Sequence, residues 1–501
     1  MKSIKVVAIG TVLILLVFFG VMYLKERDAD KSEEVFFEKA EILQYREEEQ
    51  ILCFSWQGQQ YEYSAAGIPE NIENRTADIA TREHFVVKLS IYKEESDPAI
   101  RVLITNAEAA TYFHEELIFS AQQAFTVISN DGKMVVDSGE TFRVSTDSLA
   151  INETISINFP DESNVSNAIF EIEYEKNARA YEGSFTIERR QEGLLLVNHL
   201  PLERYLIYVV PSEMPASYPN EALKAQAVAA RTYALYQMGE AKYADYHADV
   251  TDDTACQVYN AQGTNDKCIQ AVADTRAEVL LYENAPVQCT FFSTSCGVTT
   301  DGNIWEMELP YLDGGAVCRK DAQEEENLKE QLKEEESFCE FMDENTSGIE
   351  AAEPWYRWQV TFDLAQLRER IEEDIGELTA IEVTERGSYG VADQITIYGT
   401  KGTKVIENQY QIRSFFRLNG QKCTRSDGSE VSSDMMLPSG FFYISVNDDD
   451  THQASIRLTG GGYGHGSGMS QNGAKGYAEA GYDYKQILNL FYEGVSLTEW
   501  R

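Results

Sequence analysis

The sequence predicts an α+β protein in which a mixed, β-rich domain contains one prominent helix and follows a single N-terminal transmembrane helix. Short β-branched runs separated by Gly, Asp and Asn recur over Ala99–Phe142, as in a series of short strands. Ala222–Leu235 is dense in alanine and has no helix breaker, and Pro219 just before it suits a first helical turn. Val6–Leu24 is an uninterrupted apolar run, close to the roughly 20 residues that span a bilayer.

The N-terminal apolar run is expected to stay in the chain as a membrane anchor. Lys2 and Lys5 precede it, and no small-residue cleavage site of the kind that ends a signal peptide follows it. We therefore predict a cytoplasmic tail at residues 1–5 and a transmembrane helix at 6–24. This arrangement gives a single-pass location in the cell membrane, with the bulk of the chain outside the cell.

Beyond the anchor, the composition divides the chain further. Residues 25–95 combine a charged stalk with an apolar, aromatic stretch, which predicts a small β-rich module next to the membrane. Residues 96–501 form the remaining region, with an acidic, helix-prone insert at 321–353 that we expect to be a pair of solvated surface helices. A disulfide between Cys318 and Cys339 could hold this insert, and free thiols are the open alternative for the eight cysteines.

The overall charge limits the partners. The 501-residue chain carries a formal charge of −41, which argues against nucleic acid as a partner, because phosphate binding needs a basic face. The same charge argues against attraction to anionic lipid headgroups or anionic wall polymers. Hydrophobic residues make up 43% of the chain, which is enough for packed cores.

A carboxylic acid lies in a restrained position in the middle of the chain. Glu213 is flanked by Pro211 and Pro215, just before the alanine-rich helix. Tyr181–Glu203 is expected to form a hairpin that leads into a strand at Tyr205–Val210. This order would place Glu213 between the end of a strand and the start of a helix.

Two cations accompany this acid. Lys224 and Arg231 are seven residues apart in the helix and therefore share one face. An acid beside a cationic stripe is suited to binding an anion and transferring a proton to it. An ordinary exposed turn and a solvated helix face explain the same residues, and the local chemistry alone favours this simpler interpretation.

Two long motifs resemble the signatures of one family. Val209–Leu235 (VVPSEMPASYPNEALKAQAVAARTYAL) and Gly460–Gly473 (GGGYGHGSGMSQNG) closely resemble the stage II sporulation protein D family, bacterial lytic transglycosylases that act on wall glycan. Weaker matches are found at Leu200–Pro215, Asp252–Tyr259 (DDTACQVY), Phe291–Gly297 (FFSTSCG) and Leu309–Leu312 (LPYL). They follow the family's own order, so the resemblance covers the chain from roughly residue 100 to the end.

The resemblance implies an enzyme that cleaves the bond between MurNAc and GlcNAc in peptide-stripped glycan strands and leaves a 1,6-anhydro ring. One carboxyl group serves as both acid and base in this reaction, and the resemblance assigns that role to Glu213, beside the catalytic helix. Such an acid needs a pKa raised by burial, against the ionising effect of a nearby helix start and of the two cations. A wall amidase, which strips the peptides, would act first on the same strands.

The resemblance also implies a set of substrate-binding residues in the same region. They are Lys224, Arg231, Ser293, Ser295, Tyr311, His465 and Gln471. The two cations would hold the lactyl carboxylate that peptide removal exposes, because Arg can bind a carboxylate in a bidentate way. The serines and the tyrosine match positions that line the cleft, but they could equally be ordinary strand-end residues. For His465, a satisfied side chain inside a tight loop is an equally good interpretation.

No cofactor is expected. Some relatives hold zinc around the DDTACQ motif, with a histidine just before its cysteine. Here Cys256 matches the cysteine, but Ala255 precedes it and cannot bind a metal, and His247 is the other candidate nearby. We therefore expect zinc to be absent and Cys256 to form a disulfide or to remain a buried thiol.

A binding function competes with the enzymatic one. The same domain type occurs in proteins described as enhancers of wall amidases, which would bind glycan and help a partner hydrolase. A structural wall-tethering protein is a less specific third hypothesis. Glu213 favours the enzyme, because glycan binding alone does not require an acid in that turn.

Overall fold

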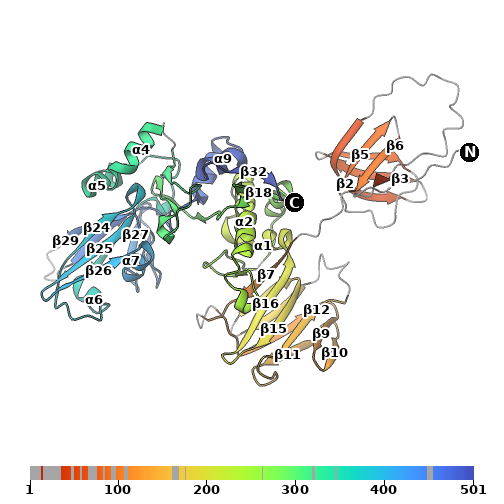
Figure 1. Ribbon diagram of the computed structural model, residues 1–501, viewed down its shortest axis with the longest axis horizontal. Coiled ribbons are helices and arrows are strands. Elements are labelled where there is room, and N and C mark those ends of the chain that lie inside the picture. Colours follow the sequence, from red (N-terminus) through yellow and green to blue (C-terminus); the bar gives the residue numbers. More distant parts are fainter. Residues whose placement is uncertain are drawn as a thin grey trace, which may run out of the picture. The chain divides into compact units, whose positions relative to one another are not determined.

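The computed structural model consists of two compact units, Met1–Asp97 and Pro98–Arg501 (Figure 1), and each is described by itself. The structure describes residues 13–14, 35–46, 50–56, 59–65, 76–82, 85–91, 98–106, 111–160, 169–174, 177–261, 263–318, 322–344, 347–447 and 455–500.

The first unit contains a small closed β-barrel. β2 (Val35–Arg46) pairs with both β3 (Ile51–Trp56) and β5 (Thr76–Arg82), and its register shifts at a bulge in each pairing. β6 (Phe85–Ile91) pairs with β5 and, in parallel, with β4 (Gln59–Ser64). Because β4 also pairs with β3, the strands close on themselves. Apolar side chains fill the interior, among them Phe37, Ile42, Leu52, Phe54, Ile79 and Val86.

The structure contradicts the predicted membrane location. Among the residues that it describes, no helix is long and apolar enough to cross a membrane. Leu13 and Ile14, the described part of the predicted anchor at 6–24, form strand β1 and pair with Ser90 and Leu89 of β6. The rest of that segment lies outside the described residues.

The second unit begins with two sheets that share one core. Phe119 of the smaller sheet packs edge-on against Phe185 of the larger one, with ring centroids 5.5 Å apart. The smaller sheet consists, in spatial order, of β11 (Thr141–Ser145), β8 (Glu116–Ala121), β13 (Ile169–Tyr174) and β14 (Asn177–Glu182). The larger sheet consists of β10 (Gly132–Val136), β9 (Phe125–Ser129), β12 (Thr154–Asn158), β15 (Ser184–Arg189), β16 (Leu194–Pro201), β7 (Ala99–Ile104) and β17 (Val250–Thr251). The predicted hairpin before the acid is confirmed by the antiparallel pair β15–β16.

The predicted strand at Tyr205–Val210 is wrong, because these residues belong to helix α1 (Leu202–Glu213). Every residue of the run is buried, so it has no polar face that would reveal a helical period. α1 follows β16 directly and ends at Glu213, and α2 (Asn220–Glu240) follows it with Pro219 as its N-cap. Figure 1 shows both helices above the end of the larger sheet.

Residues 300–468 form a second lobe between β21 (Val298–Thr299) and β31 (Met469–Ser470). Its two ends lie together: the backbone N–H of Thr300 donates to Gly466 O at 2.7 Å, and Thr300 forms a parallel bridge with Ser467. One sheet contains β28 (Glu430–Ser432), β27 (Lys422–Arg425), β23 (Trp358–Asp363), β30 (Ser455–Gly460) and β29 (Phe442–Asn447). The other contains β24 (Leu378–Arg386), β25 (Ala392–Gly399) and β26 (Thr403–Glu407), with α6 (Leu364–Arg368) and α7 (Gln409–Phe415) beside them.

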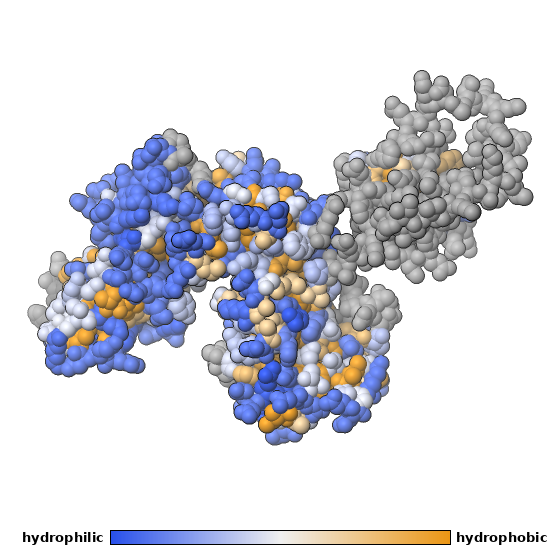
Figure 2. Space-filling model, in the orientation of Figure 1, coloured by the Kyte–Doolittle hydropathy of each residue, from blue (hydrophilic) through white to orange (hydrophobic). Residues whose placement is uncertain are grey.

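The acidic insert of this lobe contains two helices, α4 (Ala322–Gln331) and α5 (Glu335–Glu344). Their glutamates make the surface around them almost uniformly hydrophilic (Figure 2), but the helices are not only solvated. Phe338 is fully buried, and the guanidinium of Arg386 lies 3.9 Å from its ring centroid. Cys318 and Cys339 are free thiols, so the disulfide suggested between them does not form.

The C-terminal segment returns to the first half of the unit. α8 (Gln471–Glu479) and α9 (Tyr484–Phe491) pack on α2, and β32 (Ser496–Glu499) pairs with β18 (Glu278–Tyr282). Other short elements of the second unit are α3 (Asp266–Asp274), β19 (Ala285–Pro286), β20 (Phe291–Phe292) and β22 (Gly315–Ala316). The α+β class is confirmed, and the fold brings the two signature motifs together through α2 and α8.

Candidate active site

Glu213 is the last residue of α1, and its carboxyl group faces uncharged donors. The backbone N–H of Val258 donates to Glu213 Oε1 at 2.6 Å, and the side chain of Gln471 provides a second hydrogen bond. The residue as a whole is partly exposed, so a ligand can reach it, while burial dominates the surroundings of the carboxyl group. The site thus joins the first signature motif, the DDTACQVY segment and the second signature motif.

Burial raises the pKa of Glu213 to about 7, and the hydrogen bonds from Val258 and Gln471 act against this rise. Neither Lys224 nor Arg231 contributes to the shift. The C-terminal end of α1 carries the negative end of the helix dipole, which also disfavours the anion. The carboxyl group therefore retains its proton close to neutral pH, as a general acid requires.

The sequence predicted the wrong surroundings for Arg231. It is 1% exposed and binds Glu203 in a bidentate way, with Nε 2.7 Å from Oε1 and Nη2 2.8 Å from Oε2. Its three remaining donors reach the backbone carbonyls of Val272 and Glu278 and, at 3.5 Å, the hydroxyl oxygen of Thr275. A guanidinium that is enclosed and fully hydrogen-bonded has no donor left for a lactyl carboxylate.

Lys224 lies on the same helix face as Arg231, as the spacing predicted, and this face packs against α3. Its ammonium group lies 3.0 Å from Asp274 Oδ2 and 3.2 Å from Glu221 Oε1. The two cations therefore share a face, but that face holds structural ion pairs and is not directed at Glu213. The geometry does not support the carboxylate clamp that we expected from them.

Two of the three residues expected to line the cleft are buried. The Ser295 side chain donates to the carboxylate of Glu350, and Tyr311 accepts from the backbone N–H of Gln288 at 3.1 Å while burial raises its pKa to about 12. Ser293 keeps partial exposure, and its carbonyl accepts from the backbone N–H of Asn472 at 3.0 Å. Of these three residues, only Ser293 therefore remains a candidate for direct substrate contact.

His465 is satisfied inside the glycine-rich loop. Its Nε2 lies 2.9 Å from Phe291 O, and its Nδ1 accepts from the backbone N–H of Ser467 at 3.3 Å. Burial, with the positive charge of Arg413, lowers its pKa to about 4, so the ring is neutral at neutral pH. The glycines of this loop allow another segment of the chain to approach closely. At Gly468, with φ of +78°, an added Cβ would lie 2.1 Å from Thr290 O.

Gln471 is the one predicted binding residue that touches Glu213, and it connects the acid to α2. Its Nε2 donates to Gln226 Oε1 at 3.4 Å, and Gln226 is fully buried. The next residue, Asn472, donates to Thr294 Oγ1 at 2.9 Å and accepts from the Tyr218 hydroxyl. The first turn of α8 thereby links the acid, α2 and the turn between α1 and α2.

Comparison with known proteins identifies the family of this chain. A model of the stage II sporulation protein family matches residues 190–282, which include Glu213, and a model of a domain of unknown function matches 300–468. Over 328 residues, 65% of this chain, the sequence is 30% identical to an uncharacterised protein of Brachyspira hyodysenteriae, of which the match covers 74%. Over 320 residues, 60% of this chain, it is 29% identical to stage II sporulation protein D of Bacillus subtilis, of which the match covers 76%. The chain belongs to the stage II sporulation protein D family.

A third relative has a different name. The amidase enhancer of Bacillus subtilis is 29% identical to this family member over 317 residues, 58% of this chain. The match spans 40% of the amidase enhancer's own length.

Cys256 and His247 are the candidate zinc ligands that the sequence offers in this family member. Within the described parts of the chain, no group of three His, Cys, Asp or Glu residues could hold a metal ion. His247 is exposed, with its Nε2 3.6 Å from Glu188, and Cys256 is a free thiol that hydrogen-bonds Tyr233 and Tyr243. Cys256 is thus a free thiol, not a disulfide, and the absence of zinc stays a prediction.

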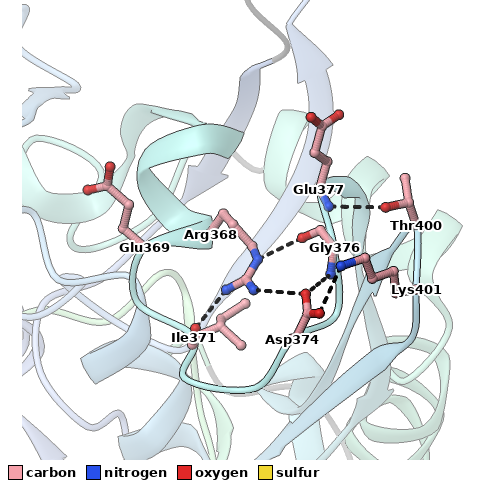
Figure 3. A pocket seen from close by; sticks show the side chains of 8 residues that line it. All are labelled: Arg368, Glu369, Ile371, Asp374, Gly376, Glu377, Thr400 and Lys401. Carbon is pink, nitrogen blue, oxygen red and sulfur yellow. Dashed lines mark hydrogen bonds and ion pairs between the residues drawn. The ribbon is translucent and has the colours of Figure 1, made fainter.

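The open depression drawn in Figure 3 lies in the second lobe and is not part of this site. It has a volume of about 770 Å³ and is bordered by α6 and the ends of β24 and β25. Its cations are already paired: Arg368 donates to three backbone carbonyls, and the ammonium group of Lys401 lies 2.8 Å from Asp374 (Figure 3). None of its lining residues belongs to either signature motif of the family.

Two residues that are important to the site were not predicted from the sequence. Val258 acts through its backbone N–H, which carries no side-chain signal. Glu350 lies in the acidic insert, where it is one of many glutamates, yet it is 1% exposed and holds residues of both the FFSTSCG segment and the glycine-rich motif.

Proposed function

We propose that this family member is a peptidoglycan lytic transglycosylase that cleaves MurNAc–GlcNAc bonds of peptide-stripped glycan strands and leaves 1,6-anhydro-MurNAc ends. The observation that carries the proposal is the buried carboxyl group of Glu213, with uncharged donors and a pKa raised to about 7. A group with that pKa is half-protonated at neutral pH, which suits a residue that must give a proton and take one back in each cycle.

The chemistry needs only this one acid. Protonated Glu213 donates its proton to the glycosidic oxygen as the bond from C1 of MurNAc to that oxygen breaks. The carboxylate then accepts the proton of the C6 hydroxyl as its oxygen bonds to C1, which closes the anhydro ring and restores the acid. Val258 and Gln471 can stabilise the carboxylate between the two proton transfers, because both donate to it.

The test is cleavage of peptide-free glycan by the purified protein, with 1,6-anhydro products identified by mass spectrometry. Glu213→Gln keeps the shape of the side chain but removes its acid and base functions. We expect it to bind glycan normally and to lose cleavage at or beyond the upper end of the about 10²–10⁴-fold range for acid–base catalysis. Glu240→Gln is the matched control, since Glu240 is also the last residue of a helix, α2, but is exposed.

The alternative is a glycan-binding enhancer of a wall amidase, which the name of one relative suggests. In that case the protein would bind glycan without forming anhydro ends, would stimulate a wall amidase, and would keep this effect in Glu213→Gln. Near-native cleavage by Glu213→Gln would instead assign the acid role to another carboxyl group. A wall amidase that removes the stem peptides first is the partner that the proposed substrate requires.

A further inference from the structure

Glu350 is a buried carboxylate that holds two chain segments of the candidate site. It is 1% exposed and lies in the loop between α5 and β23. Its Oε1 accepts from the backbone N–H of Ser295 at 2.9 Å and from the Ser470 hydroxyl at 2.6 Å. Its Oε2 accepts from the Ser295 hydroxyl. Three donors therefore converge on one acceptor group.

Each of the two serines passes this restraint on to the backbone. The oxygen of Ser295 accepts from the N–H of Gly297 at 3.1 Å, and that of Ser470 accepts from the N–H of Gly473 at 3.2 Å. Because both hydroxyl protons point at Glu350, both oxygens are free to accept these bonds. Ser470 is the N-cap of α8, so Glu350 fixes the hydroxyl that caps this helix.

The first turn of α8 carries the residue that touches the acid. Gln471 comes directly after the cap and hydrogen-bonds Glu213. The fit between Glu350 and this turn is close, because a Cβ added at Gly473 would lie 3.3 Å from Glu350 Oε2. A displacement of the cap would therefore move Gln471 relative to Glu213.

We propose that Glu350 is a positioning residue for Glu213, acting through the Ser470 cap and Gln471. The role requires a carboxylate, because an amide at this position would turn an N–H₂ group toward one of the three donors. The proposal rests on the proposed function of Glu213 and extends its site into the second lobe, to which Glu350 belongs.

Few charges act on Glu350 itself. Glu353 is the charged neighbour on its own segment, and Cys296, Tyr356 and Tyr218 are the titratable groups that face it from other segments. Glu353 also forms an ion pair with Lys475 of α8, 2.7 Å long and partly exposed. Glu353→Gln is therefore a matched control: it changes the same residue type between the same two segments without touching the cap.

The experiment measures the pH dependence of glycan cleavage in Glu350→Gln, Gln471→Leu, their double variant and Glu353→Gln. Loss of the Gln471 hydrogen bond removes a group that favours ionised Glu213, so the alkaline limb of kcat/KM should move to higher pH. We expect this shift, by about half a unit or more, in Glu350→Gln and in Gln471→Leu, with no further shift in the double variant. Glu350→Gln should also lose about 10- to 100-fold in rate at the pH optimum.

A loss of rate with an unmoved limb, or a shift equal to that of Glu353→Gln, would show that Glu350 only supports the fold. If Glu350→Gln does not fold, Ser470→Ala and Ser295→Ala remove single donors and should shift the limb in the same direction, Ser470→Ala more. An unmoved limb in both would overturn the proposal.

One measurement separates this proposal from the proposed function. The pKa of Glu213 can be obtained from melting temperatures across pH, with and without Glu213→Gln, in the Glu350→Gln background and in the parent. This readout needs no activity, so an unshifted value rejects the positioning role even in an active enzyme. A shifted value supports the role even if Glu213→Gln retains cleavage and the transglycosylase assignment fails.

Discussion

Each end of α1 carries a glutamate, and the two glutamates have hydrogen-bond partners of different charge. At the start of the helix, Glu203 is bound by the Arg231 guanidinium through two hydrogen bonds of 2.7 and 2.8 Å. At its end, Glu213 is bound by the neutral N–H groups of Val258 and Gln471. Both carboxyl groups lie among buried residues, so the difference is the charge of the partner.

This difference separates a structural role from a chemical one. A buried carboxylate that binds a guanidinium through two hydrogen bonds forms a structural ion pair, which here holds α1 against α2 and α3. A carboxyl group that is buried without a cation can hold a proton near neutral pH, and its environment raises its pKa to about 7. The same helix thus carries a structural ion pair at one end and a candidate catalytic acid at the other.

Breaking the ion pair between Arg231 and Glu203 should have the largest effect on stability. Arg231→Met leaves Glu203 buried and unpaired, so we expect it to lower the free energy of unfolding by about 3–5 kcal/mol, measured by urea denaturation. The double variant Arg231→Met with Glu203→Leu replaces the pair by apolar groups and should recover much of this loss. A loss under about 1 kcal/mol for Arg231→Met would mean that the pair does not anchor the helices.

At the other end of α1, the contribution of Glu213 to stability should depend on pH. The pKa of Glu213 is raised from 4.5 to about 7, so the folded chain keeps a proton that the unfolded chain has lost. The stability due to this proton is complete below pH 4.5 and is lost as pH rises through 7. Glu213→Gln does not titrate, so its stability relative to the parent should rise by about 3 kcal/mol between pH 4 and 8. A constant difference across this range would contradict the raised pKa.

A cation placed beside Glu213 should make its environment resemble that of Glu203. Gln471→Lys brings an ammonium group to the acid and should lower the pKa of Glu213 by about one unit or more. The alkaline limb of kcat/KM would then move to lower pH, in the direction opposite to that expected for Gln471→Leu. Movement in the same direction for both variants would mean that Gln471 does not act through the charge of the acid.

The smallest effect is expected at Lys224. Its ion pairs with Glu221 and Asp274 are partly exposed, so Lys224→Ala should change the free energy of unfolding by no more than about 1 kcal/mol. Because these pairs face α3, the relative cleavage of strands with free and with peptide-linked lactyl groups should not change. A loss of cleavage confined to strands with free lactyl carboxylates would show that Lys224 binds the substrate.

The sequence was informative where the relevant contacts are local. The helix after Pro219 and the hairpin before α1 could both be predicted from neighbouring residues, whereas Glu213 was expected after a strand and lies at the end of a helix. The run Tyr205–Val210 was misread because strand and helix look alike when every side chain is buried. The family resemblance supplied the candidate role of Glu213, which its local chemistry alone did not favour.

Long-range partners could not be predicted in the same way. The spacing of Lys224 and Arg231 correctly gave a shared face, but it did not tell what packs against that face. Ser295 matched a family position, and its partner Glu350 lies 55 residues further on in the acidic insert. Such pairs are set by tertiary packing, which neither hydrophobic periodicity nor residue type encodes.

The meeting of the two ends of the second lobe at Thr300 and Ser467 has a consequence for how the protein folds. Gln226 and Gln471 are 245 residues apart in sequence, and bringing them together through a disordered lobe would cost loop-closure entropy on the order of 4–5 kcal/mol. A lobe that is already folded, with adjacent ends, shortens this loop to about 78 residues, the 74 from Gln226 to Thr300 and the 4 from Ser467 to Gln471, and so lowers this cost by about 1 kcal/mol. Substitutions that unfold the lobe, such as at buried Trp358, would therefore disassemble the Glu213 site from a distance, without altering any residue that touches it.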